Sequence, residues 1–282
     1  MATTAKATLI TGCSTGIGRA TALRLVAAGW PVYATARKLE AIKDLEAKGC
    51  KTLALDVCDE ASMQAAVDAV VREHGAVGVL VNNAGYGLEG CFEETSMDLV
   101  RRQFETNVFG LTRLCQLVLP GMRTQRWGKI VNVSSVGGKL TLPGGAFYHA
   151  TKHAVEALSD ALRFEVRDFG VDVVVIEPGS IKTEFGNTAI ANVGRVTQED
   201  SPYAAFNTAV AGKIHEAFEG WMAAMAGNPD DVAKAIERAV SAATPKTRYT
   251  VTAAARTLLF LRRWLPDRAF DAFLGTQFPH PH

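Results

Sequence analysis

The sequence lacks an apolar run of roughly 18 residues, so it predicts no membrane-spanning helix. It also lacks an excess of charge, because 30 lysines and arginines stand against 29 aspartates and glutamates, a net charge of +1. Binding to nucleic acid through bulk charge needs a basic face, so this balance argues against a nucleic-acid partner. No long apolar segment precedes a cleavage site near the N-terminus, so we expect no signal peptide.

Cysteine is scarce and scattered. The five cysteines are odd in number and none forms a CxxC pair: Cys13, Cys50, Cys58, Cys91 and Cys115. This pattern argues against a disulfide framework and against a zinc site, and we expect no metal. It fits a reducing compartment, so we expect a cytoplasmic protein.

Short apolar, β-branched runs alternate with helical patterns along the 282 residues. The runs predict strands at Ala7–Thr11, Pro31–Ala36, Thr52–Asp56, Gly78–Asn82, Lys129–Val133, Asp172–Ile176 and, more weakly, Arg248–Thr252. Apolar residues at helical spacing lie between them, as in Ala20–Ala28 and Ala61–Glu73. Continuous apolar strands are typical of parallel sheets. We therefore predict an α/β fold in one domain spanning residues 1–282, with a doubly wound, Rossmann-type parallel sheet flanked by helices on both faces.

Two regions depart from this alternation. The region from about residue 180 to residue 228 contains Gly, Asn, Pro and scattered aromatic residues. This composition predicts an irregular substrate-binding loop and helix region. The region from about residue 253 to residue 278 is apolar with interspersed arginines. This pattern predicts a C-terminal helical extension that packs on the rest of the domain. A membrane-surface helix or a dimer contact is the alternative for this second region.

A glycine-rich turn follows the first predicted strand. It reads Thr-Gly-Cys-Ser-Thr-Gly-Ile-Gly, and a helical pattern follows at once. Glycines adopt backbone conformations closed to other residues and let a pyrophosphate approach the backbone. The start of the helix offers unpaired N–H groups and the positive end of the helix dipole to that anion. A turn without a ligand is the alternative, but this context predicts nucleotide binding by Gly12, Ser14, Thr15, Gly16, Ile17 and Gly18.

Further motifs follow the turn, most of them at the ends of predicted strands. They are Asp56-Val57, Asn82-Asn83-Ala84-Gly85, Asn107, Val131-Asn132-Val133-Ser134-Ser135, Tyr148 with Lys152 as Tyr-x-x-x-Lys, and Pro178-Gly179 with Thr183. With the Thr-Gly-x-x-x-Gly-x-Gly turn, their order and spacing resemble the short-chain dehydrogenase/reductase family over roughly residues 5–185. Residues 186–282 carry no such motif, and in that family this region holds substrate specificity.

The resemblance implies roles for individual residues. It implies four catalytic residues: Asn107, Ser135, Tyr148 and Lys152. Beyond the glycine turn, it implies these cofactor-binding residues: Asp56, Val57, Asn83, Ala84, Gly85, Tyr148, Lys152, Pro178, Gly179, Ile181 and Thr183. It also implies a homodimer or homotetramer formed through the helices that hold Asn107 and Tyr148.

The end of the second strand predicts which nicotinamide nucleotide binds. An acidic residue there would bind the ribose hydroxyls of NAD and repel a 2′-phosphate, but Ala36 stands at that position. Arg37 follows, and a guanidinium can bind a phosphate with two hydrogen bonds. We therefore expect a preference for NADP(H), with NAD(H) as the other cofactor. The alternative for Arg37 is a solvated surface charge.

Tyr148 and Lys152 are four residues apart in a helical pattern and therefore share a face. A phenol with its reference pKa of ~10 is a poor proton-transfer group near neutrality. We expect the neighbouring ammonium to lower the pKa of Tyr148, as general acid–base catalysis requires. Ser135 lies thirteen residues before Tyr148, as the family's serine does, and is expected to hydrogen-bond the substrate oxygen, whereas Ser134 is expected to be structural.

By the same resemblance, Asn107 holds a water that continues the proton path from Lys152. His149 and His153 flank the tyrosine and lysine, and we expect both to point elsewhere on the helix and to be non-catalytic. A tyrosine and a lysine at this spacing are usually surface neighbours, so the prediction depends on the accompanying motifs.

Together these features predict an oxidoreductase that transfers hydride between NADP(H) and a carbonyl or secondary alcohol. Late-chain residues, among them Trp221, Met222 and Met225, indicate an apolar pocket for a hydrophobic substrate, though such residues equally fit a core or a dimer interface. The segment Tyr33–Arg37 and the run Asn-Asn-Ala-Gly-Tyr-Gly resemble family members that act on steroids, retinoids or acylated dihydroxyacetone phosphate. The alternatives are a non-catalytic NADPH-binding regulator and the epimerase/dehydratase branch of the same fold.

Overall fold

Seven parallel strands form one sheet in the computed structural model, which describes residues 4–197, 200–218 and 226–279. The strand order is β3-β2-β1-β4-β5-β6-β7, and every neighbouring pair is parallel. The strands are β1 (Thr8–Ile10), β2 (Val32–Ala36), β3 (Lys51–Ala54), β4 (Val79–Asn82), β5 (Gly128–Val133), β6 (Val171–Pro178) and β7 (Arg248–Val251). The predicted Rossmann-type α/β fold is therefore confirmed, with each predicted strand present.

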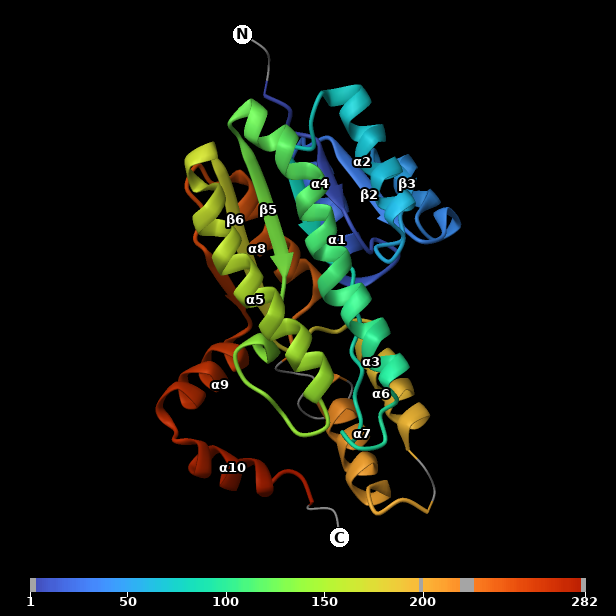
Figure 1. Cartoon of the computed structure of the whole chain (residues 1–282), viewed down its shortest axis with the longest axis vertical. Coiled ribbons are helices and arrows are strands. Elements are labelled where there is room, and N and C mark those ends of the chain that lie inside the picture. Colours follow the sequence, from blue (N-terminus) through green and yellow to red (C-terminus); the bar gives the residue numbers. More distant parts are fainter. Residues whose placement is uncertain (1–3, 198–199, 219–225, 280–282) are drawn as a thin grey trace.

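Helices cover both faces of this sheet (Figure 1). On one face α1 (Gly16–Ala27) and α8 (Pro229–Ser241) pack together over one apolar cluster that includes Leu25 and Ile236. On the other face lie α2 (Glu60–His74), α4 (Gly110–Gln125) and α5 (Ala146–Val166), over a second cluster. The inner strands are apolar on both faces because both faces are covered in this way.

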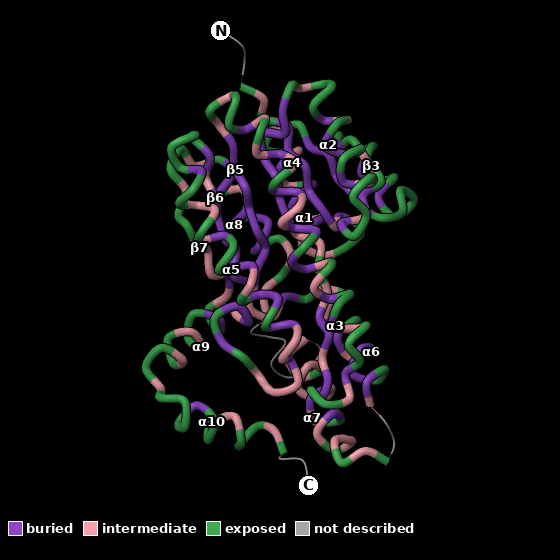
Figure 2. The backbone as a smooth tube through the Cα atoms, in the orientation of Figure 1, coloured by how far each residue is buried: buried purple, intermediate pink, exposed green. Residues whose placement is uncertain are grey.

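The shorter helical segments lie in the connections. They are the 3₁₀ segments Leu39–Ala41, Lys43–Lys48, Val136–Gly138 and Arg167–Phe169, the helix α3 (Met97–Phe104) and the π-helical turn Glu105–Phe109 that joins α3 to α4. Deep purple in Figure 2 marks the buried interior, which follows the sheet and the inner faces of its helices.

For the region of about 180–228 the sequence predicts an irregular loop and helix region, and helices predominate in the part of it that the structure describes. It contains α6 (Phe185–Val196) and α7 (Ala204–Phe218), which pack against each other beyond the carboxyl edge of the sheet (Figure 1). Small residues and scattered aromatics make the helical pattern hard to recognise in the sequence, and the two helices depend on tertiary contacts such as the one between them. Trp221, Met222 and Met225 lie outside the described residues.

The C-terminal extension forms two helices that stand away from the sheet, α9 (Ala253–Trp264) and α10 (Asp267–Gly275) (Figure 1). The break falls at Leu265, which precedes a proline and is extended, as residues before proline usually are. Only Ala255 and Phe270 are buried on these helices, so the expected packing of one helix on the body was wrong. Among the described residues, no helix is both long and apolar enough to cross a membrane.

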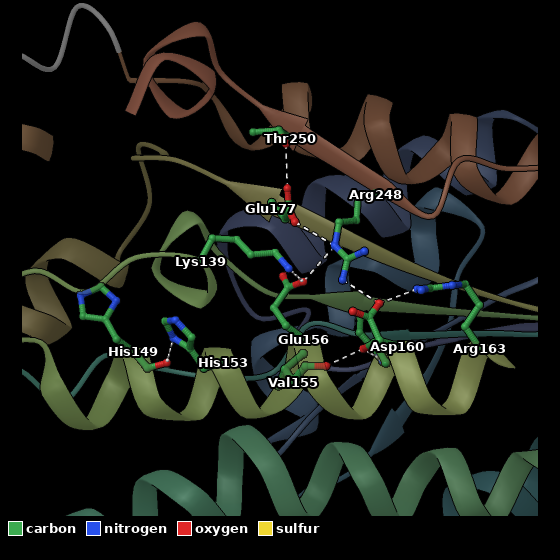
Figure 3. A network of polar contacts seen from close by, with 12 residues as sticks. Lys139, His149, His153, Val155, Glu156, Asp160, Arg163, Glu177, Arg248 and Thr250 are labelled. Atoms are coloured by element: carbon green, nitrogen blue, oxygen red, sulfur yellow. Dashed lines mark hydrogen bonds and ion pairs between the residues drawn. The ribbon is translucent and has the colours of Figure 1, made fainter. Parts of the chain in front are cut away.

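A network of buried charges fastens α5 to the far edge of the sheet (Figure 3). The Arg248 guanidinium of β7 lies 3.1 Å from a carboxylate oxygen of Glu156 on α5 and 3.2 Å from one of Glu177 on β6. Both carboxylates are almost fully buried. Lys139, in the loop after β5, lies 2.9 Å from Glu156 and adds a second cation. Burial raises the pKa of Glu177, which shows that the neighbouring charges only partly offset the loss of hydration.

Replacing Arg248 by methionine should destabilise the fold by about 2 to 4 kcal/mol, because it leaves buried carboxylates with less opposite charge. A buried carboxylate without its cation becomes neutral when it takes up a proton. The loss of unfolding free energy should therefore be smaller in mildly acidic buffer. Urea denaturation at neutral and acidic pH measures both effects.

Arg163→Met is the matched control. Arg163 also binds a carboxylate, Asp160 at 2.7 Å, but the Asp160 side chain is 43% exposed, whereas those of Glu156 and Glu177 are almost fully buried. Its loss should cost no more than about 1 kcal/mol. Equal effects of the two substitutions would contradict a role for burial in the network.

Candidate active site

A cavity of about 910 Å³ opens at the carboxyl edge of the sheet, where the chain leaves β1, β4, β5 and β6. Ligands of open α/β sheets usually bind at this edge. All the site residues expected from the sequence line this cavity except Gly18 and Asn107, which lie behind its wall. The structure therefore brings the glycine turn, the Tyr-x-x-x-Lys pair and the strand-end motifs together in one place.

The glycine turn depends on close backbone approaches. Gly12 and Gly16 have left-handed backbone angles, with φ of +73° and +58°. A Cβ atom on Gly18 would lie 2.3 Å from the Gly12 carbonyl oxygen and 2.5 Å from the Asn83 side-chain nitrogen. The glycine turn therefore accepts no side chain at position 18. Because Gly18 packs against Gly12 and Asn83, it lies behind the cavity wall and does not line the cavity.

Asn83, at the end of β4, ties that strand to the turn. Its side-chain amide donates hydrogen bonds to the carbonyl oxygens of Thr11 at 2.9 Å and Gly12 at 3.1 Å. The Thr11 hydroxyl in turn accepts hydrogen bonds from the backbone nitrogens of Asn83 and Ala84, both at 3.0 Å. The ends of β1 and β4 are thus held in register on either side of the cavity.

The start of α1 fits an anionic group. Its N-cap residue, Thr15, makes no side-chain capping hydrogen bond, and the first turn contains no acidic residue. The first N–H groups of a helix have no partner within it and attract negative charge. Ser14, Thr15 and Gly16 line the cavity at this point, so the residues present fit a nucleotide pyrophosphate.

The outer end of the cavity carries Arg37 and Asp56. Arg37 is exposed and follows the buried Ala36, the last residue of β2. Asp56 and Val57 lie beyond β3, which ends at Ala54, so the expectation that they close this strand was wrong. The Asp56 carboxylate instead accepts a hydrogen bond from the Cys58 backbone nitrogen at 3.0 Å, as an aspartate does in a turn.

The segment after β6 forms the opposite wall of the cavity. Pro178 ends the strand, and Gly179, Ile181 and Thr183 follow along the wall. The Thr183 side chain lies over the glycine turn, 3.1 Å from the position of a Cβ atom on Gly16. The two halves of the expected cofactor site are therefore in direct contact.

Tyr148 and Lys152 project from the first turns of α5, and both are more than nine-tenths buried. The Lys152 ammonium donates a hydrogen bond to the Val133 carbonyl oxygen at 2.9 Å. Burial lowers the pKa of Lys152 to about 8, although the carboxylate of Glu156 opposes this shift. Ser135 lies between α5 and β5, where its hydroxyl accepts a hydrogen bond from the Gly137 backbone nitrogen at 3.1 Å.

The pKa of Tyr148 differs from the expectation. Burial raises it, and a hydrogen bond with Ser135 lowers it only in part. Loss of hydration outweighs the effect expected from Lys152, whose ammonium is directed to Val133 and lies 5.8 Å from the centre of the tyrosine ring. The phenol is therefore neutral in this structure, as a proton donor must be.

Asn107 lies in the π-helical turn, and its amide is held on both sides. Its oxygen accepts a hydrogen bond from the Tyr86 backbone nitrogen at 3.2 Å. Its nitrogen donates to the Tyr86 carbonyl oxygen at 3.0 Å and the Thr151 hydroxyl at 3.1 Å. Asn107 and Lys152 both lie next to Gly85, where a Cβ atom would be 3.1 Å and 3.8 Å from them. This proximity is compatible with the predicted water-mediated path between them.

Two cavity residues were missed or misplaced by sequence reasoning. His149 was expected to point away, but it is buried, lines the cavity and has Nδ1 3.1 Å from the Gly137 carbonyl oxygen. Burial lowers its pKa to about 4. Glu89 also lines the cavity, and no pattern in the sequence marked it, because it lies in a loop between glycines. His153 does lie away from the cavity, as expected, with its ring nitrogen 2.9 Å from the His149 carbonyl oxygen.

The parallel sheet, the glycine turn at a helix start and the strand-end cavity place the protein among the Rossmann-type, nucleotide-binding folds. Residues 6–193 match the short chain dehydrogenase family. The match covers most of the chain, and the protein belongs to this family, whose members are NAD(P)-binding oxidoreductases.

Several known proteins are similar to the chain. A protein of Bacteroides thetaiotaomicron named 3-ketodihydrosphingosine reductase is 41% identical over 197 residues, covering 70% of this chain and 71% of its own length. A protein of Ornithobacterium rhinotracheale named NADPH-dependent 3-dehydrocapnine reductase is 35% identical over 289 residues, covering 93% and 94%. The solved structure of a Burkholderia phymatum short chain dehydrogenase/reductase in complex with NAD superposes with a TM-score of 0.79, at 26% identity, covering 100% of this chain and 98% of that one.

Proposed function

We propose that this oxidoreductase uses NADP(H) to interconvert a ketone and a secondary alcohol in a hydrophobic, lipid-like substrate. The observation that carries the proposal is the meeting of Tyr148, Lys152 and Ser135 with the glycine turn in one cavity. The nicotinamide cofactor, when bound, supplies or accepts the hydride.

The residues that line the cavity fit each part of such a cofactor. The start of α1 would bind the pyrophosphate, and Arg37 would bind a 2′-phosphate on the adenosine ribose. Asp56 and Val57 would meet the adenine. The nicotinamide half would lie against the remaining expected residues, which are Asn83, Ala84, Gly85, Tyr148, Lys152, Pro178, Gly179, Ile181 and Thr183.

In the direction of reduction, Tyr148 gives its hydroxyl proton to the substrate oxygen as negative charge develops there. Ser135 donates a hydrogen bond to the same oxygen and steadies it. Lys152 has a pKa of about 8, so near neutrality it exchanges protons readily and can return one to the tyrosine phenolate. Asn107 would hold the water that connects Lys152 to solvent.

Apolar side chains support a hydrophobic substrate. Beyond Tyr148 the cavity wall is formed by the loop after β5, by α6 and α7, and by the C-terminal segment, through Leu140, Leu142, Pro143, Phe185, Val210, Ile214, Phe218 and Phe278. Two of the similar proteins are named as reductases of a keto and a dehydro compound. These features favour a lipid-like ketone and do not separate steroids, retinoids and long-chain lipids from one another.

A non-catalytic NADPH-binding regulator on the same fold is the second candidate. Its cavity would need no acid–base pair, whereas this chain buries Tyr148 and Lys152 beside each other at an energetic cost. A homodimer or homotetramer through the helices that hold Asn107 and Tyr148, and a cytoplasmic location, stay predictions.

We also propose peripheral contact of the C-terminal helices with a lipid surface. On α9 every charged residue is an arginine, namely Arg256, Arg262 and Arg263. Phe260 and Trp264 on the same helix are 63% and 70% exposed. Arginine charge beside exposed aromatic side chains is typical of helices that bind anionic membranes.

Tyr148→Phe should abolish turnover, with kcat falling by ~10²–10⁴-fold, because only the proton-transfer hydroxyl is lost. NADPH affinity should stay within about threefold, because the ring is kept. The measurements are NADPH oxidation with a panel of long-chain and cyclic ketones, and NADPH binding by fluorescence. Tyr203→Phe, at a tyrosine outside the cavity whose hydroxyl binds Glu93 at 2.6 Å, is the control. Retention of more than a tenth of the rate in Tyr148→Phe would contradict the assignment.

Ala36→Asp combined with Arg37→Ala should invert the cofactor preference from NADP(H) to NAD(H). The new carboxylate repels a 2′-phosphate, and the guanidinium that binds this phosphate is removed. Each change should shift the ratio of kcat/KM for the two cofactors by roughly tenfold to a hundredfold. Arg19→Ala is the control, because Arg19 pairs with Asp44 on the outside of the turn. A wild-type protein that already prefers NAD(H) would show that Arg37 is solvated.

Phe260→Ser with Trp264→Ser should strongly reduce co-sedimentation with vesicles of phosphatidylcholine and phosphatidylglycerol. The control is Phe164→Ser, which removes an exposed aromatic side chain on α5. Sedimentation velocity of the same variants tests whether a second copy of the chain binds this surface instead. Loss of a dimer without any change in vesicle binding would assign the surface to a second copy of the chain.

A further inference from the structure

An acidic side chain that the proposed reaction does not use lies in the substrate part of the cavity. Glu89 belongs to the loop between β4 and α3 and lines the cavity together with Tyr148 and His149. One of its carboxylate oxygens lies 2.8 Å from the position of a Cβ atom on Gly145, and the His149 ring lies 2.5 Å from the same position. Glu89 therefore faces the first turn of α5, where the reacting group is expected.

The loop that carries Glu89 is firmly held. The Gly90 backbone nitrogen donates a hydrogen bond to the Gly144 carbonyl oxygen at 2.8 Å. The Asn192 side chain of α6 donates to the Gly87 carbonyl oxygen at 2.6 Å, and the Asn207 side chain of α7 accepts from the Cys91 backbone nitrogen at 2.9 Å. A carboxyl group fixed in this way needs no further ordering to bind a ligand group.

No cation of the described chain offsets the charge of Glu89. Burial alone raises the pKa of Glu89 to about 8, so the carboxyl group is mostly protonated near pH 7 until a cation binds beside it. Among the basic side chains that line the cavity, Lys152 binds the Val133 carbonyl oxygen, Lys213 pairs with Glu216 at 3.1 Å, and Arg195 donates to the Asn192 side chain at 3.3 Å. The low pKa of His149 keeps its ring neutral near pH 7. A carboxyl group in such surroundings gains most from a ligand that brings its own positive charge.

We propose that Glu89 binds an ammonium group of the substrate, so that the preferred substrates are long-chain amino ketones and amino alcohols. The amino group would lie close to the reacting carbon, because Glu89 faces the part of α5 that carries Tyr148. The apolar side chains of α6 and α7 would receive the hydrocarbon chain. This inference rests on the proposed function and specifies its substrate class.

The position of Glu89 also affects Tyr148. Ionised Glu89 raises the pKa of Tyr148, and an ammonium group bound at Glu89 offsets that charge. A substrate with the amino group should therefore bind more tightly without making the tyrosine phenolate harder to form.

Glu89→Gln tests the proposal, because glutamine keeps the size of the side chain but cannot ionise to pair with an ammonium group. Two substrates are compared with NADP⁺, a long-chain 2-amino-3-alkanol and the same 3-alkanol without the amino group. The wild-type kcat/KM should favour the amino alcohol by about tenfold to a hundredfold, the range of one charge-assisted hydrogen bond. Glu89→Gln should abolish this preference and leave kcat/KM for the plain alcohol within about threefold.

Glu184→Gln is the matched control. Glu184 lines the same cavity, but it is exposed and binds the Asn187 side chain at 3.0 Å. This variant should keep the wild-type preference. Equal loss of rate on both alcohols in Glu89→Gln would overturn the proposal and assign Glu89 to proton transfer or to structure. An unchanged preference in Glu89→Gln would also overturn it.

Binding of octylammonium, measured by calorimetry against octanol, separates this inference from the proposed reaction. If neither alcohol is oxidised, the proposed reaction fails, and octylammonium still tests Glu89. Binding to the wild type and to Glu184→Gln that is lost in Glu89→Gln supports the ammonium site. Equal binding, or absent binding, in all three proteins overturns it.

Discussion

The hydrogen bonds from the Asn83 side chain to the Thr11 and Gly12 carbonyl oxygens hold the two halves of the site together. They fix the end of β4 against the glycine turn that follows β1. The glycine turn then sets the direction in which α1 begins. The same contact requires Gly18 to come so close that no side chain fits there. Because the turn and the strand ends are locked to each other, the wall of the cavity is formed before any ligand binds.

The second constraint is the burial of charge on α5. Lys152 and Glu156 are one turn apart on this helix, and both are almost fully buried. Lys152 is satisfied by the Val133 carbonyl oxygen, whereas Glu156 is satisfied by cations from β7 and from the loop after β5. The helix that carries Tyr148 is therefore fixed at one end by a backbone oxygen of the central strand and further along by the far edge of the sheet. Such double anchoring suits a residue that must hold a proton at a defined place.

Much of the fold and of the site could be predicted from the sequence, because the signals were local. Continuous β-branched runs such as Val79–Asn82 indicate buried strands. In a parallel sheet the carboxyl ends of the strands, such as the one at Pro178, meet at one edge. The remaining features depend on tertiary contacts. The direction of the Tyr148 pKa shift follows from burial under neighbouring elements, and the cavity position of Glu89 follows from how a loop folds back on α5. The bounds of α6 and α7 could not be predicted, because the two helices pack against each other and the sequence does not show this contact.

The π-helical turn Glu105–Phe109 gives Asn107 a position that depends on the number of residues before it. A π-turn arises when a regular α-helix contains one residue more than its hydrogen-bond pattern needs. Removing one residue from this stretch would restore the regular pattern and rotate the side chains on one side of it by about 100° relative to the other. The amide of Asn107 would then no longer meet both Tyr86 and Thr151, and the backbone of Tyr86 would lose its hydrogen bonds with Asn107. The position of Asn107 therefore depends on the length of the chain in this stretch as well as on the type of residue.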